Sequence, residues 1–147
     1  MTATQSKADP MTTTLVTRWQ AAAGKFIDLA AALPEEKFET ELVNGARTIG
    51  SVLRHVAYWN RYVAAKLSGN KADESANELT PQACPDKAAV IKELTRNRSD
   101  IANGLERTLD ATSLETICMG LEHLCEHYGQ LAVYARLRGV TPPASQS

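Results

Sequence analysis

The stretch TSLETICMGLEHLCEHYGQLAVYARLRG, residues 112–139, indicates the fold of this protein more strongly than any other segment. Its apolar residues recur at intervals of three and four, which is the pattern of one buried face of an amphipathic α-helix. Thr112 and Glu115 have the spacing of a capping box at the start, and Gly139 marks the end. The apolar face consists of Leu114, Ile117, Leu121, Leu124, Leu131 and Leu137.

Three earlier segments show the same periodicity and predict three further helices. The first covers about residues 13–33 and ends at Pro34, which cannot continue a helix. The second covers about residues 49–68, with Thr48 as a good N-cap residue. The third begins at Pro85, because proline is favoured at the first helical position. No segment has the pattern of a β-strand.

Four amphipathic helices without strands predict an all-α protein. Helices of this length bury their apolar faces by packing as an antiparallel four-helix bundle, in which metal sites are commonly built from facing helices. The chain has 147 residues, which fits one domain. We therefore predict a disordered polar segment at residues 1–12, followed by a single bundle domain at residues 13–147.

The composition disfavours several classes of function. The net charge is -1 and no Lys/Arg-rich run occurs, which disfavours a nucleic-acid partner. No stretch approaches the roughly 18 apolar residues of a membrane span. The polar N-terminal segment does not have the apolar region of a secretory signal, so we expect a cytoplasmic protein with reduced thiols. Cys118 and Cys125 are separated by about 10.5 Å along one helix, which is too far for a disulfide.

The only three histidines of the chain form a candidate metal site. His123 and His127 are four residues apart and project from one helix face. His55 lies on the apolar stripe of the second segment, which antiparallel packing would bring against the fourth. Three converging imidazoles would suit one divalent ion, Zn²⁺, Ni²⁺ or Fe²⁺, with a position left open. The alternative is that each histidine is an ordinary hydrogen-bonded core residue.

Two segments resemble the DinB/YfiT-like superfamily of helical bundles, which is unrelated to the polymerase that shares the name. EHYGQLAVYARLRGVTPPAS, residues 126–145, resembles the closing helix and tail of that family. RTIGSVLRHVAYWNRY, residues 47–62, resembles its second helix and follows the same order along the chain. The resemblance implies that one divalent metal ion is held by His55, His123 and His127. Tyr128 departs from the family pattern, because many relatives carry arginine after the last histidine.

The resemblance also implies a function. Characterised relatives include thiol-dependent transferases and an isomerase that uses a low-molecular-weight thiol, and other members are described as metal-dependent hydrolases. We therefore expect a metal-dependent transferase or hydrolase, with a small-molecule substrate and a thiol held on the metal. Relatives often pair as homodimers through helix faces. The alternative is a non-catalytic metal-binding or stress-associated interaction module, and a third interpretation is a metal-free helical interaction domain.

Two neighbours of the histidines are candidate catalytic residues. Glu126 completes an H-x-x-E-H pattern and is a candidate general base, although it lies about 100° around the helix from His127. The alternative for Glu126 is a solvent-facing carboxylate without a catalytic role. Gln130 is three residues after His127, where its side chain can orient a ligand or form an interhelical contact.

Other residues near the histidines have less direct interpretations. Cys125 points away from the flanking histidines, so we expect a small buried residue there. Arg98 interrupts an apolar stripe and either lines a pocket or extends to the surface. Three aromatic residues near His55 form either the wall of a pocket or part of the core: Tyr58, Trp59 and Tyr62.

Overall fold

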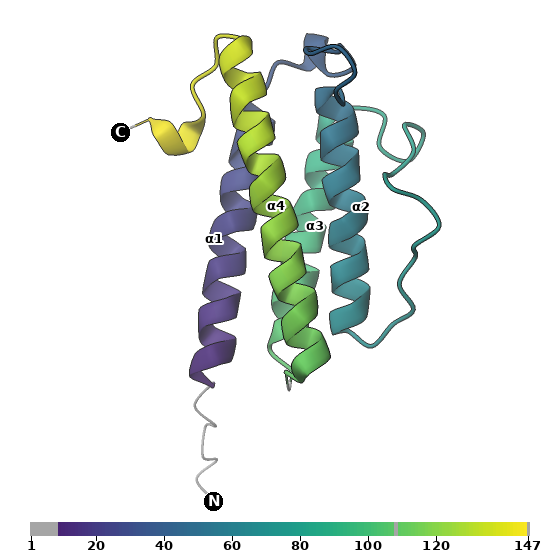
Figure 1. Ribbon diagram of the computed structural model, residues 1–147, viewed down its shortest axis with the longest axis vertical. Helices are drawn as coiled ribbons and strands as arrows, with labels where there is room; N and C mark the ends of the chain where they lie inside the picture. Colours follow the sequence, from purple (N-terminus) through teal and green to yellow (C-terminus); the bar gives the residue numbers. More distant parts are fainter. Residues whose placement is uncertain (1–8, 108, 147) are drawn as a thin grey trace, which may run out of the picture.

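The computed structural model describes residues 9–107 and 109–146, which form four long helices and two short 3-10 helices (Figure 1). Within these residues there is no strand, so the predicted all-α four-helix bundle is confirmed. The elements in chain order are α1 (Pro10–Ala32), η1 (Glu35–Lys37), α2 (Ile49–Leu67), α3 (Lys87–Leu105), α4 (Ala111–Leu137) and η2 (Pro143–Ser145).

The helices run up, down, down and up in the view of Figure 1. Helix α2 packs against α3 and α4, and α1 packs against the same two helices on the other side. The pairs α2/α4 and α1/α3 are therefore antiparallel, whereas α2/α3 and α1/α4 are parallel. The parallel pairs arise because the long connection after α2 returns along the bundle before α3 begins. The antiparallel packing of α2 on α4 is the contact that the predicted metal site requires.

Helix α1 begins earlier than the sequence pattern predicts. It starts at Pro10, and the carboxylate of Asp9 accepts a hydrogen bond from the Thr12 backbone amide at 3.1 Å. Residues 10–12 are therefore helical and not part of a disordered segment, because an Asp N-cap followed by proline extends the first turn. Residues 1–8 of the predicted disordered segment lie outside the described residues.

The predicted starts of α3 and α4 are displaced by one or two residues. Asp86 caps α3 by accepting from the Ala89 amide at 2.8 Å, so Pro85 precedes the helix. Asp110 caps α4 by accepting from the Ser113 amide at 2.8 Å, so Thr112 lies inside the helix. In both cases an aspartate carboxylate satisfies a free amide and interacts favourably with the helix dipole.

The start of α2 is packed tightly against the connection from α1. The Gly50 amide donates a hydrogen bond to the Phe38 carbonyl at 2.7 Å. A Cβ atom at Gly50 would lie 2.6 Å from both the Phe38 ring and the Glu39 carboxylate. One turn later the buried Arg54 side chain donates to both oxygens of Glu39, at 2.6 and 3.1 Å. These contacts set the position of the helix that carries His55.

The connection between α2 and α3 lies along the outer side of α2. The Leu79 amide donates to the Arg54 carbonyl at 3.3 Å, and the Leu79 side chain is buried. The Tyr58 hydroxyl donates to the Asp73 carbonyl at 2.9 Å and accepts from the Ala76 amide at 3.1 Å. These bonds place residues 73–79 beside the middle of α2, next to His55.

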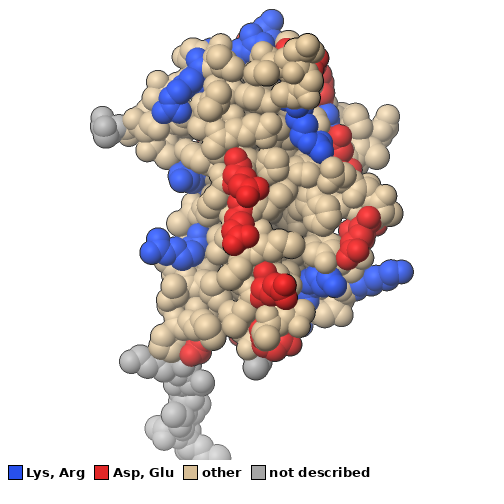
Figure 2. All heavy atoms as spheres, viewed as in Figure 1, with Lys and Arg blue, Asp and Glu red and all other residues tan. Residues whose placement is uncertain are grey.

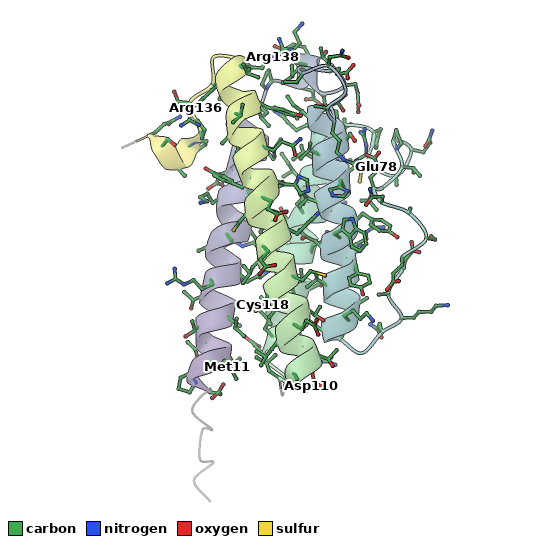
Figure 3. The ribbon with its side chains drawn as sticks, viewed as in Figure 1. Met11, Glu78, Asp110, Cys118, Arg136 and Arg138 are labelled. Atoms are coloured by element: carbon green, nitrogen blue, oxygen red, sulfur yellow. The ribbon has the colours of Figure 1, made fainter. Side chains whose placement is uncertain are left out.

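Two expectations from the sequence concern the exposure of Cys125 and the presence of a membrane-spanning helix. Cys125 is exposed and not buried, because it lies on the outer face of α4 together with Cys118, which is labelled in Figure 3. Both thiols are free, as is the buried Cys84. Among the described residues, no helix is long and apolar enough to span a lipid bilayer.

Candidate metal centre

The three histidines meet between α2 and α4. His55 comes from α2, and His123 and His127 come from α4, with ring centroids 4.6 to 4.9 Å apart. Their ligand nitrogens all lie within 4.8 Å of one another. His55 is buried, and the other two are half-buried at the edge of the bundle. Figure 3 shows how the side chains of α2 and α4 fill the space between these helices.

The connection after α2 orients His55. Its Nδ1 lies 2.5 Å from the Asn77 carbonyl oxygen. A carbonyl can only accept, so Nδ1 carries the proton and Nε2 keeps its lone pair. This is the arrangement found around metal-ligating histidines, in which a backbone carbonyl fixes the tautomer and the ring orientation.

A chain of three hydrogen bonds orients His127. Its Nδ1 donates to the Gln130 side-chain oxygen at 2.8 Å, and the Gln130 amide donates to the Tyr134 hydroxyl at 3.0 Å. The Tyr134 hydroxyl in turn donates to the Arg47 carbonyl at 2.9 Å. Tyr134 is buried and Gln130 is half-buried, so both contacts are sheltered. The Nε2 atom of His127 is thereby left as the acceptor.

His123 completes the cluster by contacting His55 directly. The two Nε2 atoms are 2.9 Å apart. Because His55 carries its proton on Nδ1, His123 donates from Nε2 in this arrangement. A cation between the two rings would replace this hydrogen bond, provided that His123 shifts its proton to Nδ1.

The surroundings of His55 and His123 favour the neutral form of both imidazoles. Burial lowers the pKa of His123 to about 4, with smaller effects from His127, His55 and Arg47. Burial also lowers the pKa of His55, against the opposing effect of its hydrogen bond to Asn77. Histidine binds a metal only in the neutral form, so both shifts favour metal binding at neutral pH.

The donor set fits a divalent metal ion. Two nitrogens of one tetrahedral zinc ion, each about 2.0–2.1 Å from it, are about 3.3 Å apart. The 2.9 Å between the His55 and His123 Nε2 atoms is close to this value. The remaining separations between ligand nitrogens do not exceed 4.8 Å and would shorten when the rings turn toward a common ion. Three imidazoles suit Zn²⁺, Ni²⁺ or Fe²⁺, and the donor set does not distinguish among them.

Several other residues singled out by sequence lie away from the cluster. Glu126 is exposed on α4, and its side chain makes no hydrogen bond to a described residue. Figure 2 shows acidic side chains in a row over α4, and the exposed acidic residues of this helix include Glu122 and Glu126. Arg98 donates to the Gln20 side chain at 2.5 Å and packs over α1, on the other side of the bundle. Of the two candidate catalytic residues, Gln130 is therefore the one whose side chain contacts a candidate metal ligand, His127.

An apolar pocket opens beside His123. It measures about 200 Å³ and lies between α2 and α4. Its lining residues are Trp59, Asn60, Val63, Met119, Gly120 and His123. Trp59 is half-buried and serves as a pocket wall, which was one of two interpretations from sequence.

The sequence did not indicate Asn77 or the remaining pocket residues. Asn77 is 22 residues from His55 and acts through its backbone carbonyl, so no side-chain pattern marks it. Gly120 could have been noticed in the sequence, because glycine inside a helix costs about 1 kcal/mol relative to alanine and often indicates close packing at that position. The residue lies on the same helix face as His123, three positions earlier.

The fold and the site define an all-α bundle with three histidines on two facing helices. A sequence profile described as the DinB superfamily matches residues 18–131, which is more than half of the chain. The protein therefore belongs to the DinB superfamily, as the two sequence motifs implied. No curated protein matches the chain.

Proposed function

We propose that the protein binds one divalent metal ion through His55, His123 and His127 and acts as a metal-dependent enzyme on a small molecule. The observation that supports this proposal is the convergence of three imidazoles beside an apolar pocket. When bound, the ion would supply Lewis-acid chemistry. The residues of the chain contribute by keeping His55 and His123 neutral, by orienting His55 and His127 through Asn77 and Gln130, and by offering an apolar binding surface.

Thiol transfer is the reaction type that we favour over hydrolysis. Hydrolytic enzymes commonly place a carboxylate or imidazole general base next to the attacking water. Among the described residues, the metal-ligand cluster consists of imidazoles alone, and Glu126 is exposed on the outer face of α4. A low-molecular-weight thiol brings its own nucleophilic sulfur, which borderline divalent metals bind well. In such a reaction a sulfur–carbon bond forms, the leaving group departs from the carbon, and the thiol proton is released.

Metal content tests the first part of the proposal. The untagged protein would be analysed by mass spectrometry after supplementation with Zn²⁺, Ni²⁺ or Fe²⁺, next to the His55→Ala and His127→Ala variants. We expect about one equivalent in the wild type and a loss in both variants, because two remaining imidazoles bind a divalent ion weakly. A wild type without metal under all three conditions would overturn the metal site.

Activity tests the second part. The metal-loaded protein would be mixed with cysteine or glutathione and 1-chloro-2,4-dinitrobenzene, and thioether formation would be followed by absorbance. We expect a rate above the uncatalysed reaction that disappears in His127→Ala. A protein that holds metal but shows no turnover across a panel of thiols and electrophiles would instead support a non-catalytic metal-binding module.

Location and assembly are also part of the proposal. A thiol-dependent enzyme requires a reducing compartment, which supports a cytoplasmic location. A homodimer is proposed from the resemblance to paired relatives, and light scattering on the purified protein would test it.

A further inference from the structure

We propose that the apolar pocket beside His123 binds an aryl or short branched-alkyl group of the substrate. This inference rests on the proposed function, because it assigns the reacting end of the same substrate to the histidine cluster. The pocket of about 200 Å³ is lined almost entirely by apolar atoms. For comparison, an apolar protein cavity of about 150 Å³ is large enough to bind benzene. A phenyl-sized group therefore fits the volume and the chemistry of the lining.

The pocket exists because position 120 carries no side chain. Gly120 is buried where α4 approaches α2. A Cβ atom there would lie 3.1 Å from one Val63 methyl carbon and 3.5 Å from the other. A larger side chain would have to displace Val63 or occupy the pocket. The glycine thus permits both the close helix contact and the open volume.

The wall formed by Trp59 is held in place by the residue that orients His55. The Trp59 indole donates to the Asn77 side-chain oxygen at 3.0 Å, while the Asn77 carbonyl oxygen accepts from His55. The indole ring is also 6.4 Å from the His123 ring and 5.4 Å from the Tyr62 ring. One residue therefore positions both a metal-ligand candidate and the pocket wall, so the two parts are set relative to each other.

The larger surface hollows do not offer this combination. A hollow of about 420 Å³ between α2 and α3 is lined by charged and polar side chains, including Arg61, Arg96 and Asp100. Another, of about 450 Å³, lies beside Lys25 and Arg98. Neither is lined by a histidine. Adjacency to His123 selects the smaller apolar pocket as the substrate site.

Two probes test the pocket with and without metal. The first probe is toluene, added to metal-free protein while the methyl resonances of Val63 and Met119 are followed by NMR. The second is the pair imidazole and 4-phenylimidazole, titrated into cobalt-loaded protein while the visible spectrum is followed. Burial of a phenyl group predicts that 4-phenylimidazole binds about 10- to 100-fold more tightly than imidazole.

Matched variants on α4 separate the pocket from general effects on the helix. Gly120→Val fills the pocket, and its control is Gly129→Val, because a Cβ atom at Gly129 meets nothing within 4 Å. Met119→Glu places a charge at the pocket, and the fold tolerates it because Met119 is 40% exposed. Its control is Val133→Glu, because Val133 is 57% exposed. We call the tighter binding of 4-phenylimidazole relative to imidazole the phenyl gain. We expect Met119→Glu and Gly120→Val to lose the phenyl gain, and both controls to keep it.

The outcomes distinguish this inference from the proposed function. Toluene shifts at Val63 and Met119, with a phenyl gain lost in Met119→Glu, would support the pocket even if Gly120→Val fails to fold. The absence of toluene shifts, or a phenyl gain that persists in Met119→Glu, would overturn it. Toluene binding without any phenyl gain in cobalt-loaded protein would overturn it as well, since the pocket would not serve the histidine site. If the protein takes up no metal, the proposed function fails, and toluene binding still supports the pocket.

Discussion

Replacing Gln130 by alanine should weaken metal binding without removing any metal ligand. The Gln130 oxygen accepts the Nδ1 proton of His127, and its amide is tied to Tyr134. Without this acceptor, the His127 ring loses the bond that fixes its tautomer and rotation. Loss of such a partner typically reduces metal affinity about 10- to 100-fold, which corresponds to about 1.4–2.7 kcal/mol.

The opposite change should strengthen binding. Gln130→Glu keeps the size of the side chain and supplies a charged acceptor, which makes the opposite imidazole nitrogen a stronger donor to the metal. We expect an affinity about 3- to 10-fold above that of the wild type. Glu126→Ala is the matched control, because Glu126 is an exposed residue on the same helix. Its affinity should equal that of the wild type if Glu126 takes no part.

Competition with a chromophoric chelator at pH 7.5 measures these affinities for Zn²⁺. The series is informative because the order Gln130→Glu, wild type, Gln130→Ala follows from the acceptor that each side chain offers to His127 Nδ1. An affinity of Gln130→Ala within about twofold of the wild type would refute the reasoning, since the partner would then not position His127. A loss in Glu126→Ala of the same size would instead indicate a general effect of altering α4.

Three further predictions concern stability. Gly50→Ala should lower the free energy of unfolding by about 1–2 kcal/mol in urea denaturation, because the new methyl group would lie 2.6 Å from the Phe38 ring and the cost of overpacking exceeds the gain in helix propensity. An unchanged midpoint of denaturation would contradict this packing. Glu39→Ala should cost about 1–2 kcal/mol, because it leaves the buried Arg54 guanidinium without its bidentate partner, and a variant as stable as the wild type would show that the pair contributes little. Metal-free protein should lose stability as the pH falls from about 6.5 to about 4, because the unfolded chain binds a proton on His123 near the usual 6.5 and the folded chain does not until about 4. The full shift in pKa would amount to about 3 kcal/mol, and we expect about half of it because the ring is only partly buried. His123→Gln should flatten this part of the profile, and an unaltered slope would argue against a buried neutral His123.

Local sequence determined the number of helices, most of their buried faces and most of their ends. Leu137 is an exception, because it was predicted on the apolar face of α4 and is 57% exposed. The heptad-like spacing of apolar residues predicted the four helices because each had to bury one stripe. Thr48 was identified correctly as the N-cap of α2, since its hydroxyl accepts from the Ser51 amide. Errors occurred where two capping residues competed within a few positions, as at Asp110 and Thr112. Such competition is decided by the backbone path into the helix, which neighbouring elements constrain.

The same local information predicted the histidine cluster. Residues four apart on one helix share a face, and a histidine on the apolar stripe of a facing helix is expected to point toward them. The resemblance to the DinB superfamily pointed to the same three positions, and the match over residues 18–131 shows the family. Periodicity, however, states only which way a side chain faces. It does not determine how far α2 and α4 are shifted relative to each other along their axes.

Tertiary structure alone decided what surrounds the histidines. The connection after α2 brings the Asn77 carbonyl to His55 across 22 residues, and this contact depends on the path of the loop rather than on any residue pattern. Helix packing decided that Gly120 faces Val63 closely enough to leave an apolar pocket beside His123. It also placed Glu126 in solvent and Gln130 on His127. The physical reason is that helix formation is governed by local spacing, whereas orientation of a ligand and the shape of a pocket depend on contacts between segments that are distant in the chain.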